Sequence, residues 1–129
     1  YEHSKKIDSV SATFERIIAF TGQRDPDLLN DYAWQLANYS QDTTHALALV
    51  NEAIEKYGHD ADYYDTRALV DGRLHQYDEA LRDEETAASY AAKADKSYFD
   101  EQLGYYKKLK DEVEKMKKEE AEKAGKDKK

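Results

Sequence analysis

Histidines and acidic residues are the side chains of this chain that could take part in catalysis or bind a metal. The histidines are His3, His45, His59 and His75. No two of them have the spacing of a metal-binding pair. His59 lies close to Asp60 and Asp62, which is a possible ligand set, but aspartates at this position are equally well explained as helix caps. With 28 acidic residues in the chain, neighbouring carboxylates carry little information.

The motifs of the common catalytic classes are absent from the sequence. It contains no G-x-S-x-G nucleophile motif, no P-loop and no glycine-rich nucleotide-binding loop. It also contains no cysteine, which excludes disulfides, thiolate chemistry and zinc fingers. We therefore expect no enzyme activity, no bound metal and no cofactor.

The charge of the chain restricts its possible partners. The net charge of −8 argues against nucleic acid, because a phosphate backbone requires a basic surface. Residues 107–129 contain ten lysines and seven acidic residues, so residues 1–106 carry −11. No apolar run approaches the roughly 20 residues of a membrane-spanning helix. Because the chain opens without Met inside a helix-like stretch, we expect a piece of a longer protein that has lost an upstream part.

The pattern of residue types predicts an all-α fold. There are only five glycines and one proline, and no regular alternation of apolar and polar residues. The expected helices cover residues 4–21, 26–39, 43–57, 61–74 and 77–92, and a sixth begins near residue 96. Apolar residues recur at spacings of three and four from Phe99 to Met116, which predicts a capping helix over 95–117. From 118 to 129 the chain has no apolar face, and we expect a charged tail that is frayed or disordered.

A spacing of 34 residues relates two parts of the chain. Ala46 and Ala53 are repeated as Ala80 and Ala87, and residues 28–40 align with residues 62–74 at the same spacing. A fixed period of this length is typical of stacked helical hairpins. The alanines place small side chains in one row on a helix, as is needed where another helix approaches closely.

These segments resemble tetratricopeptide repeats over about residues 27–94. The stretches that carry the resemblance are DYAWQLANYS, HALALVNEAI and YYDTRALVDGRLHQYDEAL. The resemblance implies antiparallel hairpins in a right-handed superhelical stack, with two hairpins over 26–94 and an N-terminal helix over 1–22. That helix is a candidate half of a degenerate repeat, since Ala12 and Ala19 precede Ala46 and Ala53 by 34 residues. It also implies that Trp34 lies in the core.

Three charged residues depart from the family pattern in the second hairpin. Arg67, Asp71 and Glu84 stand where apolar residues are usual. A lone buried charge is costly, so we expect a structural ion-pair cluster in which Arg67 lies between two carboxylates and pairs with Glu84. The alternatives are a functional site, a shifted hairpin in which these side chains reach water, and a misaligned repeat. His75 replaces a glycine usual in the turn between the helices, which predicts a strained left-handed residue.

The resemblance also implies a binding surface, the concave face formed by the first helix of each hairpin. The side chains that the register places there are Asp31, Gln35, Asn38, Tyr39, Asp62, Asp65, Thr66, Leu69 and Arg73. One subgroup of the family grips acidic chaperone tails with Lys, Arg and Asn, but here the matching positions hold Asp31, Gln35 and Thr66. We therefore expect a basic or mixed peptide. Tyr39 is equally compatible with packing, and Asp62 and Asp65 with a favourable position at a helix N-terminus.

Two functions remain open at this point. The first is a non-catalytic protein–protein interaction module, or scaffold, that binds a peptide or partner protein on the concave face. The second is a structural docking or dimerisation domain of a missing upstream domain, which exposed Phe14, Ile17 or Phe20 would favour. We expect a monomer, with a dimer through residues 99–116 as the alternative. LNDYAW and YYDTRA are similar to bacterial repeats, which sometimes occur in the cell envelope; the cytoplasm is the alternative.

Overall fold

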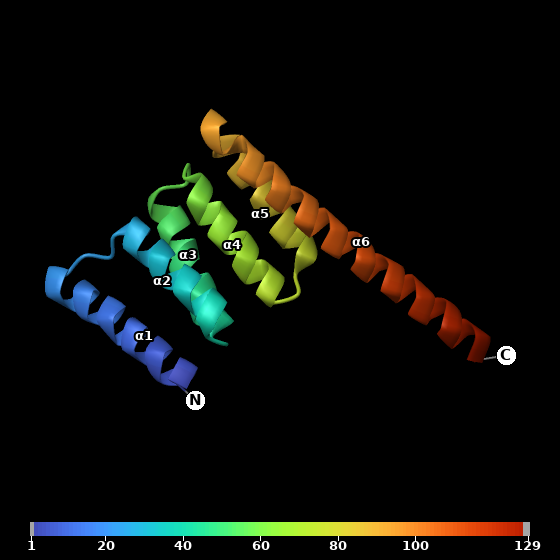
Figure 1. The fold of residues 1–129 in the computed structure, drawn as a ribbon, viewed down its shortest axis with the longest axis horizontal. Helices are drawn as coiled ribbons and strands as arrows, with labels where there is room; N and C mark the ends of the chain where they lie inside the picture. Colours follow the sequence, from blue (N-terminus) through green and yellow to red (C-terminus); the bar gives the residue numbers. More distant parts are fainter. Residues whose placement is uncertain (1, 128–129) are drawn as a thin grey trace.

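The computed structural model describes the backbone of residues 2–127 and the side chains of residues 9–126 (Figure 1). The helices are α1 (Glu2–Thr21), α2 (Pro26–Tyr39), α3 (Thr43–Lys56), α4 (Ala61–Arg73), α5 (Tyr77–Tyr90), the short 3-10 helix η1 (Lys93–Asp95) and α6 (Lys96–Asp127). No strand occurs in this range, so the predicted all-α fold is confirmed. The first five helices begin and end within two residues of their predicted bounds.

Local capping explains where these helices begin. The side chains of Asp25, Asp42 and Asp60 each accept hydrogen bonds from backbone N–H groups in the first turn of α2, α3 and α4. These bonds satisfy N–H groups that have no partner inside the helix. Pro26 follows the first of these caps and has a φ suited to the first turn. Gly22 lies beyond the end of α1 with a φ of 65°, a conformation that glycine adopts without strain.

The repeated alanines form the packing seam that the sequence predicts. Ala46 and Ala53 on α3, and Ala80 and Ala87 on α5, are all fully buried. Helix α3 packs against α2, and α5 packs against α4, while α4 also contacts α2 and α3. The main core therefore lies between α2, α3 and α4. Its largest members are Leu29, Tyr32, Leu36, Leu49, Val50, Tyr63 and Val70.

Helix α1 contacts only α2 among the described helices. The ring of Phe14 stacks on that of Tyr32, with their centroids 4.9 Å apart. Near the end of the helix, Phe20 is 92% exposed. Ala12 and Ala19 are exposed as well, unlike the buried alanines 34 residues later. The alanines of α1 therefore have no helix packed against them in the described part of the chain.

Helix α6 packs along α5 and extends beyond the other helices at its C-terminal end (Figure 1). Phe99 and Tyr106 are buried, as expected of a helix that covers the last hairpin. The helix continues to Asp127, whereas the sequence predicts fraying or disorder from 118. Lysine, glutamate and alanine have high helix propensity, and no proline interrupts them. No helix in the described range has the length and apolar character needed to cross a membrane.

Trp34 does not lie in the core, and that prediction is wrong. Its side chain is 42% exposed and meets the ring of Tyr39 edge-on, at a centroid distance of 6.2 Å. The buried face of α2 is formed by residues such as Leu29, Ala33 and Leu36, spaced by three or four. Trp34 directly follows Ala33, so the helical turn of about 100° per residue carries it to the edge of that face.

Candidate functional site

The predicted binding face joins α2 and α4, which lie against each other. Two side-chain contacts connect the helices. The Tyr63 hydroxyl donates a hydrogen bond to the Asp27 carboxylate, and Arg73 Nε donates to the carbonyl oxygen of Ala37 at 3.1 Å. The structure therefore brings the residues of both helices to one region.

The predicted contact residues differ in how far they can reach a partner. Asp31, Asp62 and Tyr39 are exposed, and Gln35 is half-buried. Thr66 is buried and therefore contributes to packing, contrary to the prediction that it contacts a partner.

Other members of the set are engaged within the chain. Leu69 packs against the main core. The side-chain amide of Asn38 donates to the carbonyl oxygen of Trp34 at 3.0 Å. The Asp65 carboxylate accepts a hydrogen bond of 2.8 Å from the hydroxyl of Tyr98 on α6. The sequence had no signal for this last contact, because 33 residues and two turns separate the pair.

Acidic side chains gather at the N-terminal ends of α2 and α4. Partial burial raises the pKa of Asp62, and the negative charges of Asp60, Asp65, Asp95 and Asp27 raise it further. The pKa of Asp31 is raised by partial burial and then by Asp27. Carboxylates held near one another disfavour ionisation, so this end of the face favours cations.

Arg67 pairs with Asp83, and the predicted pairing with Glu84 is wrong. Its Nε donates to Asp83 Oδ2 at 2.9 Å and its Nη2 to Asp83 Oδ1 at 2.7 Å. Its Nη1 donates to Asn51 Oδ1 on α3 at 3.1 Å, and its guanidinium lies over the ring of Tyr64, 5.3 Å from the centroid. Asp83 and Glu84 are adjacent on α5 and point about 100° apart, so only one of them can face Arg67.

Asp71 is a buried member of the same cluster, with 4% of its surface exposed. Burial raises the pKa of Asp71 to about 8, and the hydrogen bond with Asp83 contributes in the same direction. Arg67 acts in the opposite direction but does not outweigh burial. At neutral pH, Asp71 therefore keeps its proton, while Asp83 is the carboxyl group that binds Arg67.

Glu84 is completely buried and belongs to a second acidic pair. Neither of its carboxyl oxygens meets a nitrogen or hydroxyl donor among the described residues. Burial raises the pKa of Glu84 to about 9. The carboxyl group of Asp65 is close enough for a hydrogen bond to Glu84, and it raises this pKa further. The predicted ion-pair cluster thus consists of Arg67 and Asp83 with Asp71 beside them, and Glu84 is separate and uncharged at neutral pH.

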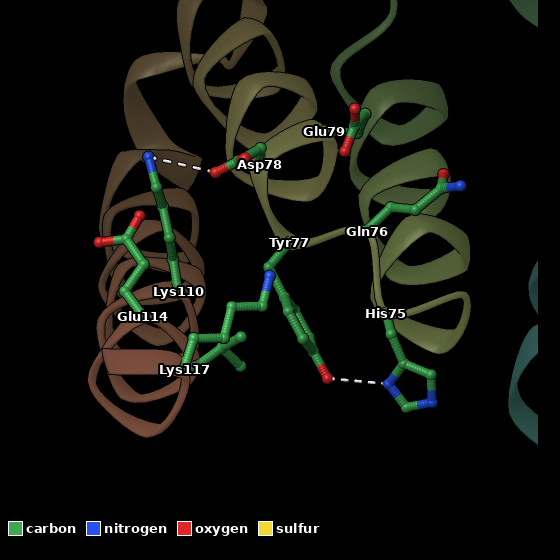
Figure 2. A pocket seen from close by; sticks show the side chains of 9 residues that line it. His75, Gln76, Tyr77, Asp78, Glu79, Lys110, Glu114 and Lys117 are labelled. Carbon is green, nitrogen blue, oxygen red and sulfur yellow. Dashed lines mark hydrogen bonds and ion pairs between the residues drawn. The ribbon is translucent and has the colours of Figure 1, made fainter. Parts of the chain in front are cut away.

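A polar cavity of about 260 Å³ lies between the α4–α5 turn and α6 (Figure 2). His75 has a φ of 61°, as predicted for this turn, and its Nδ1 is 2.9 Å from the hydroxyl of Tyr77. Across the cavity, Lys110 Nζ lies 3.2 Å from Asp78 Oδ1. The lining contains both acidic and basic side chains, so it does not select one charge of ligand.

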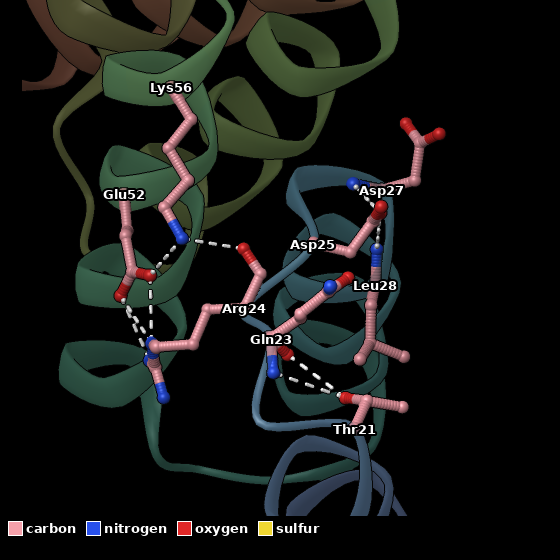
Figure 3. A network of polar contacts seen from close by, with 8 residues as sticks. All are labelled: Thr21, Gln23, Arg24, Asp25, Asp27, Leu28, Glu52 and Lys56. Carbon is pink, nitrogen blue, oxygen red and sulfur yellow. Dashed lines mark hydrogen bonds and ion pairs between the residues drawn. The ribbon is translucent and has the colours of Figure 1, made fainter.

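The loop between α1 and α2 is tied to α3 by a separate polar network (Figure 3). Arg24 donates three hydrogen bonds of 2.7 to 3.0 Å to the Glu52 carboxylate. Lys56 Nζ lies 3.1 Å from the same carboxylate and also donates to the carbonyl oxygen of Arg24. These contacts lower the pKa of Glu52 and fix the loop, so their role is structural.

No protein-family model, no curated protein and no solved structure matches this chain. In the part of the chain that the structure describes, no three His, Asp or Glu side chains converge as a metal-ligand set.

Proposed function

We propose that this chain is a non-catalytic protein-interaction module of tetratricopeptide type, which binds a basic or mixed peptide segment of a partner protein on the face formed by α2 and α4. The observation that carries the proposal is the acidic surface at the N-terminal ends of these helices. Asp31 and Asp62 are exposed there, and partial burial, followed by the charges of neighbouring carboxylates, raises their pKa values.

The physical advantage of a basic partner is relief of repulsion between these carboxylates. A lysine or arginine side chain placed between Asp31 and Asp62 would favour the ionised form of both groups. Exposed charges of this kind increase the association rate and the selectivity for oppositely charged partners. Exposed Tyr39 adds a ring on which the apolar part of a peptide can pack.

Peptide binding to charge variants tests the proposal. The probes are a labelled peptide rich in lysine and arginine and an acidic peptide of equal length. We expect the chain to bind the basic peptide, and Asp31→Asn/Asp62→Asn to weaken binding roughly tenfold. Glu101→Gln/Glu112→Gln on α6 is the matched control, because it changes the net charge equally at exposed positions. Equal affinities for the two double variants would contradict the proposal.

The second candidate function is docking or dimerisation through α1. The observation that favours it is the exposure of Phe20 and Ile17, which line one open depression with Thr13 and Arg16. Large exposed apolar side chains often mark association surfaces. This function predicts a concentration-dependent dimer in sedimentation experiments that Phe20→Ser/Ile17→Ser converts to a monomer. A wild-type chain that stays monomeric at high concentration would exclude self-association by this surface.

A further inference from the structure

Glu84 carries a polar group at a position where the fold provides no ordinary partner for it. It is one of the largest side chains with no exposed surface, and both of its oxygens lack a nitrogen or hydroxyl donor within the described part of the chain. A carboxylate in such a place keeps its charge only if a cation or several donors compensate it. The residues around Glu84 therefore decide whether it can be ionised.

Among the described residues, the titratable groups near Glu84 come from three helices, and none of them is a cation. Asp65 lies on α4, and Asp83 is the next residue on α5. Tyr98 and Tyr106 on α6 are close enough for the charge of Glu84 to raise their own pKa values. Arg67 on α4, which could have compensated the charge, is bound to Asp83 instead. The site thus stabilises a protonated Glu84.

Helix α6 is the element whose departure would expose this site most easily. Within the described part of the chain, its backbone contacts only α5 and η1, whereas α4 and α5 pack against each other and α4 also packs against α2 and α3. Its side-chain contacts with the hairpin are the buried Phe99 and the packing of Tyr106 and Leu109 on Ala68 and Ala80. The Tyr98–Asp65 hydrogen bond and the Lys110–Asp78 ion pair add to them. Moving α6 would admit water to Glu84 and leave the main core between α2, α3 and α4 intact.

We propose that α6 is a proton-controlled latch, which stays docked on the α4–α5 hairpin while Glu84 carries a proton and is released when Glu84 ionises. The direction of the pH dependence follows from the difference in proton affinity between the docked and released states. Because the docked state holds the Glu84 proton more tightly than the released state, docking is strongest below the pKa of a solvated glutamate and weakens as pH rises through the docked pKa. Between these limits the ratio of released to docked molecules increases up to tenfold for each pH unit.

Release of α6 also changes the acidic face, a consequence that rests on the function proposed above. Tyr98 leaves with α6, so the carboxylate of Asp65 loses the hydrogen bond that now occupies it. Asp65 then joins Asp31 and Asp62 as an acceptor for a basic partner. The latch thus couples proton release to an enlarged binding surface.

A distance measurement without any partner tests the latch independently of peptide binding. The chain has no cysteine, so spin labels can be attached at Gln76→Cys and Lys117→Cys, which line the same cavity on opposite sides of the α6 contact (Figure 2). We expect a short label-to-label distance at pH 6. As pH rises towards 10, a longer population should appear while the far-UV circular dichroism still shows a folded helical protein.

Two variants make the test specific to Glu84. In Glu84→Gln the side chain cannot ionise, and we expect the short distance to persist over the whole pH range. Glu85→Gln makes the same chemical change at the next, exposed position and should behave like the wild type. An unchanged distance in the wild type up to pH 10, a lengthening that accompanies general loss of helix, or equal behaviour of the two variants would each overturn the proposal.

Discussion

At the residue scale, the second hairpin contains two buried acidic side chains that are neutralised by protonation and not by pairing with a basic side chain. Asp71 is next to Asp83, and Glu84 is next to Asp65, so each buried acid faces a carboxylate on the opposite helix. Repulsion between the two groups of a pair vanishes when one of them is protonated. The hairpin is therefore more stable where these acids are neutral than where they are charged.

Stability should consequently fall as pH rises from about 5 to 9. The folded-state pKa of Glu84 is raised to about 9, so its stabilising contribution is complete below the pKa of an unfolded glutamate and is lost through this window. Because each unit of pKa shift corresponds to about 1.4 kcal/mol, we expect this contribution to lower the free energy of unfolding by about 5 kcal/mol. Glu84→Gln should abolish the part of that slope that comes from Glu84, leave the part that comes from Asp71, and be more stable than the wild type at pH 9. Urea unfolding at several pH values measures this, with Glu85→Gln as the control that keeps the slope.

Arg67 should be important for stability because its partner is largely buried. Arg67→Met leaves Asp83 without its two hydrogen bonds, beside the buried Asp71. We expect a loss of about 2–3 kcal/mol in chemical denaturation. Arg82→Ala breaks an exposed pair with Glu79 and should cost less than about 1 kcal/mol. Similar losses in both variants would show that the Arg67 pair has no special role.

At the element scale, the hairpins depend on small side chains where the helices approach. Ala53→Leu inserts a large side chain into the buried core between α2, α3 and α4 and should destabilise the protein by about 1–3 kcal/mol. Ala48→Leu lies on the exposed face of the same helix and should change stability by less than about 0.5 kcal/mol. Thermal unfolding of the two variants compares them. An equal effect at both positions would mean that the seam is not tightly packed.

Helix α6 shows that an element can have two parts with different environments. Its first half carries the buried Phe99 and Tyr106, and beyond Val113 its described side chains are exposed. The apolar stripe of the sequence marks the packed part as far as Val113, but its last member, Met116, is 59% exposed. In the exposed half, high helix propensity favours the helix without packing. The helix therefore ends ten residues beyond the predicted capping segment.

At the scale of the whole molecule, the charge is divided between an acidic body and a basic end. Residues 1–106 carry −11, and the carboxylates at the ends of α2 and α4 concentrate part of that charge. If a basic peptide binds there, its association rate should fall several-fold between low salt and about 0.5 M salt, because salt screens exposed charges. Stopped-flow measurements at increasing salt would show this. An association rate independent of salt would exclude electrostatic recognition.

The sequence by itself determined the all-α class, the bounds of the first five helices and the buried alanine seam. These features depend on local capping, on the spacing of apolar residues and on side-chain size, all of which can be read along the chain. It also indicated that the second hairpin contains unusual charges. It identified Arg67, Asp71 and Glu84 because they interrupt an otherwise apolar pattern.

The tertiary structure decided which side chains meet. It paired Arg67 with Asp83, left Glu84 buried beside Asp65, and placed Tyr98 of α6 on a predicted contact residue. These outcomes depend on the rotation of each helix about its axis and on how far α6 slides along α5. A difference of one residue rotates a side chain by about 100°, so a pattern that correctly assigns a helix still leaves the partners of its charged residues undetermined.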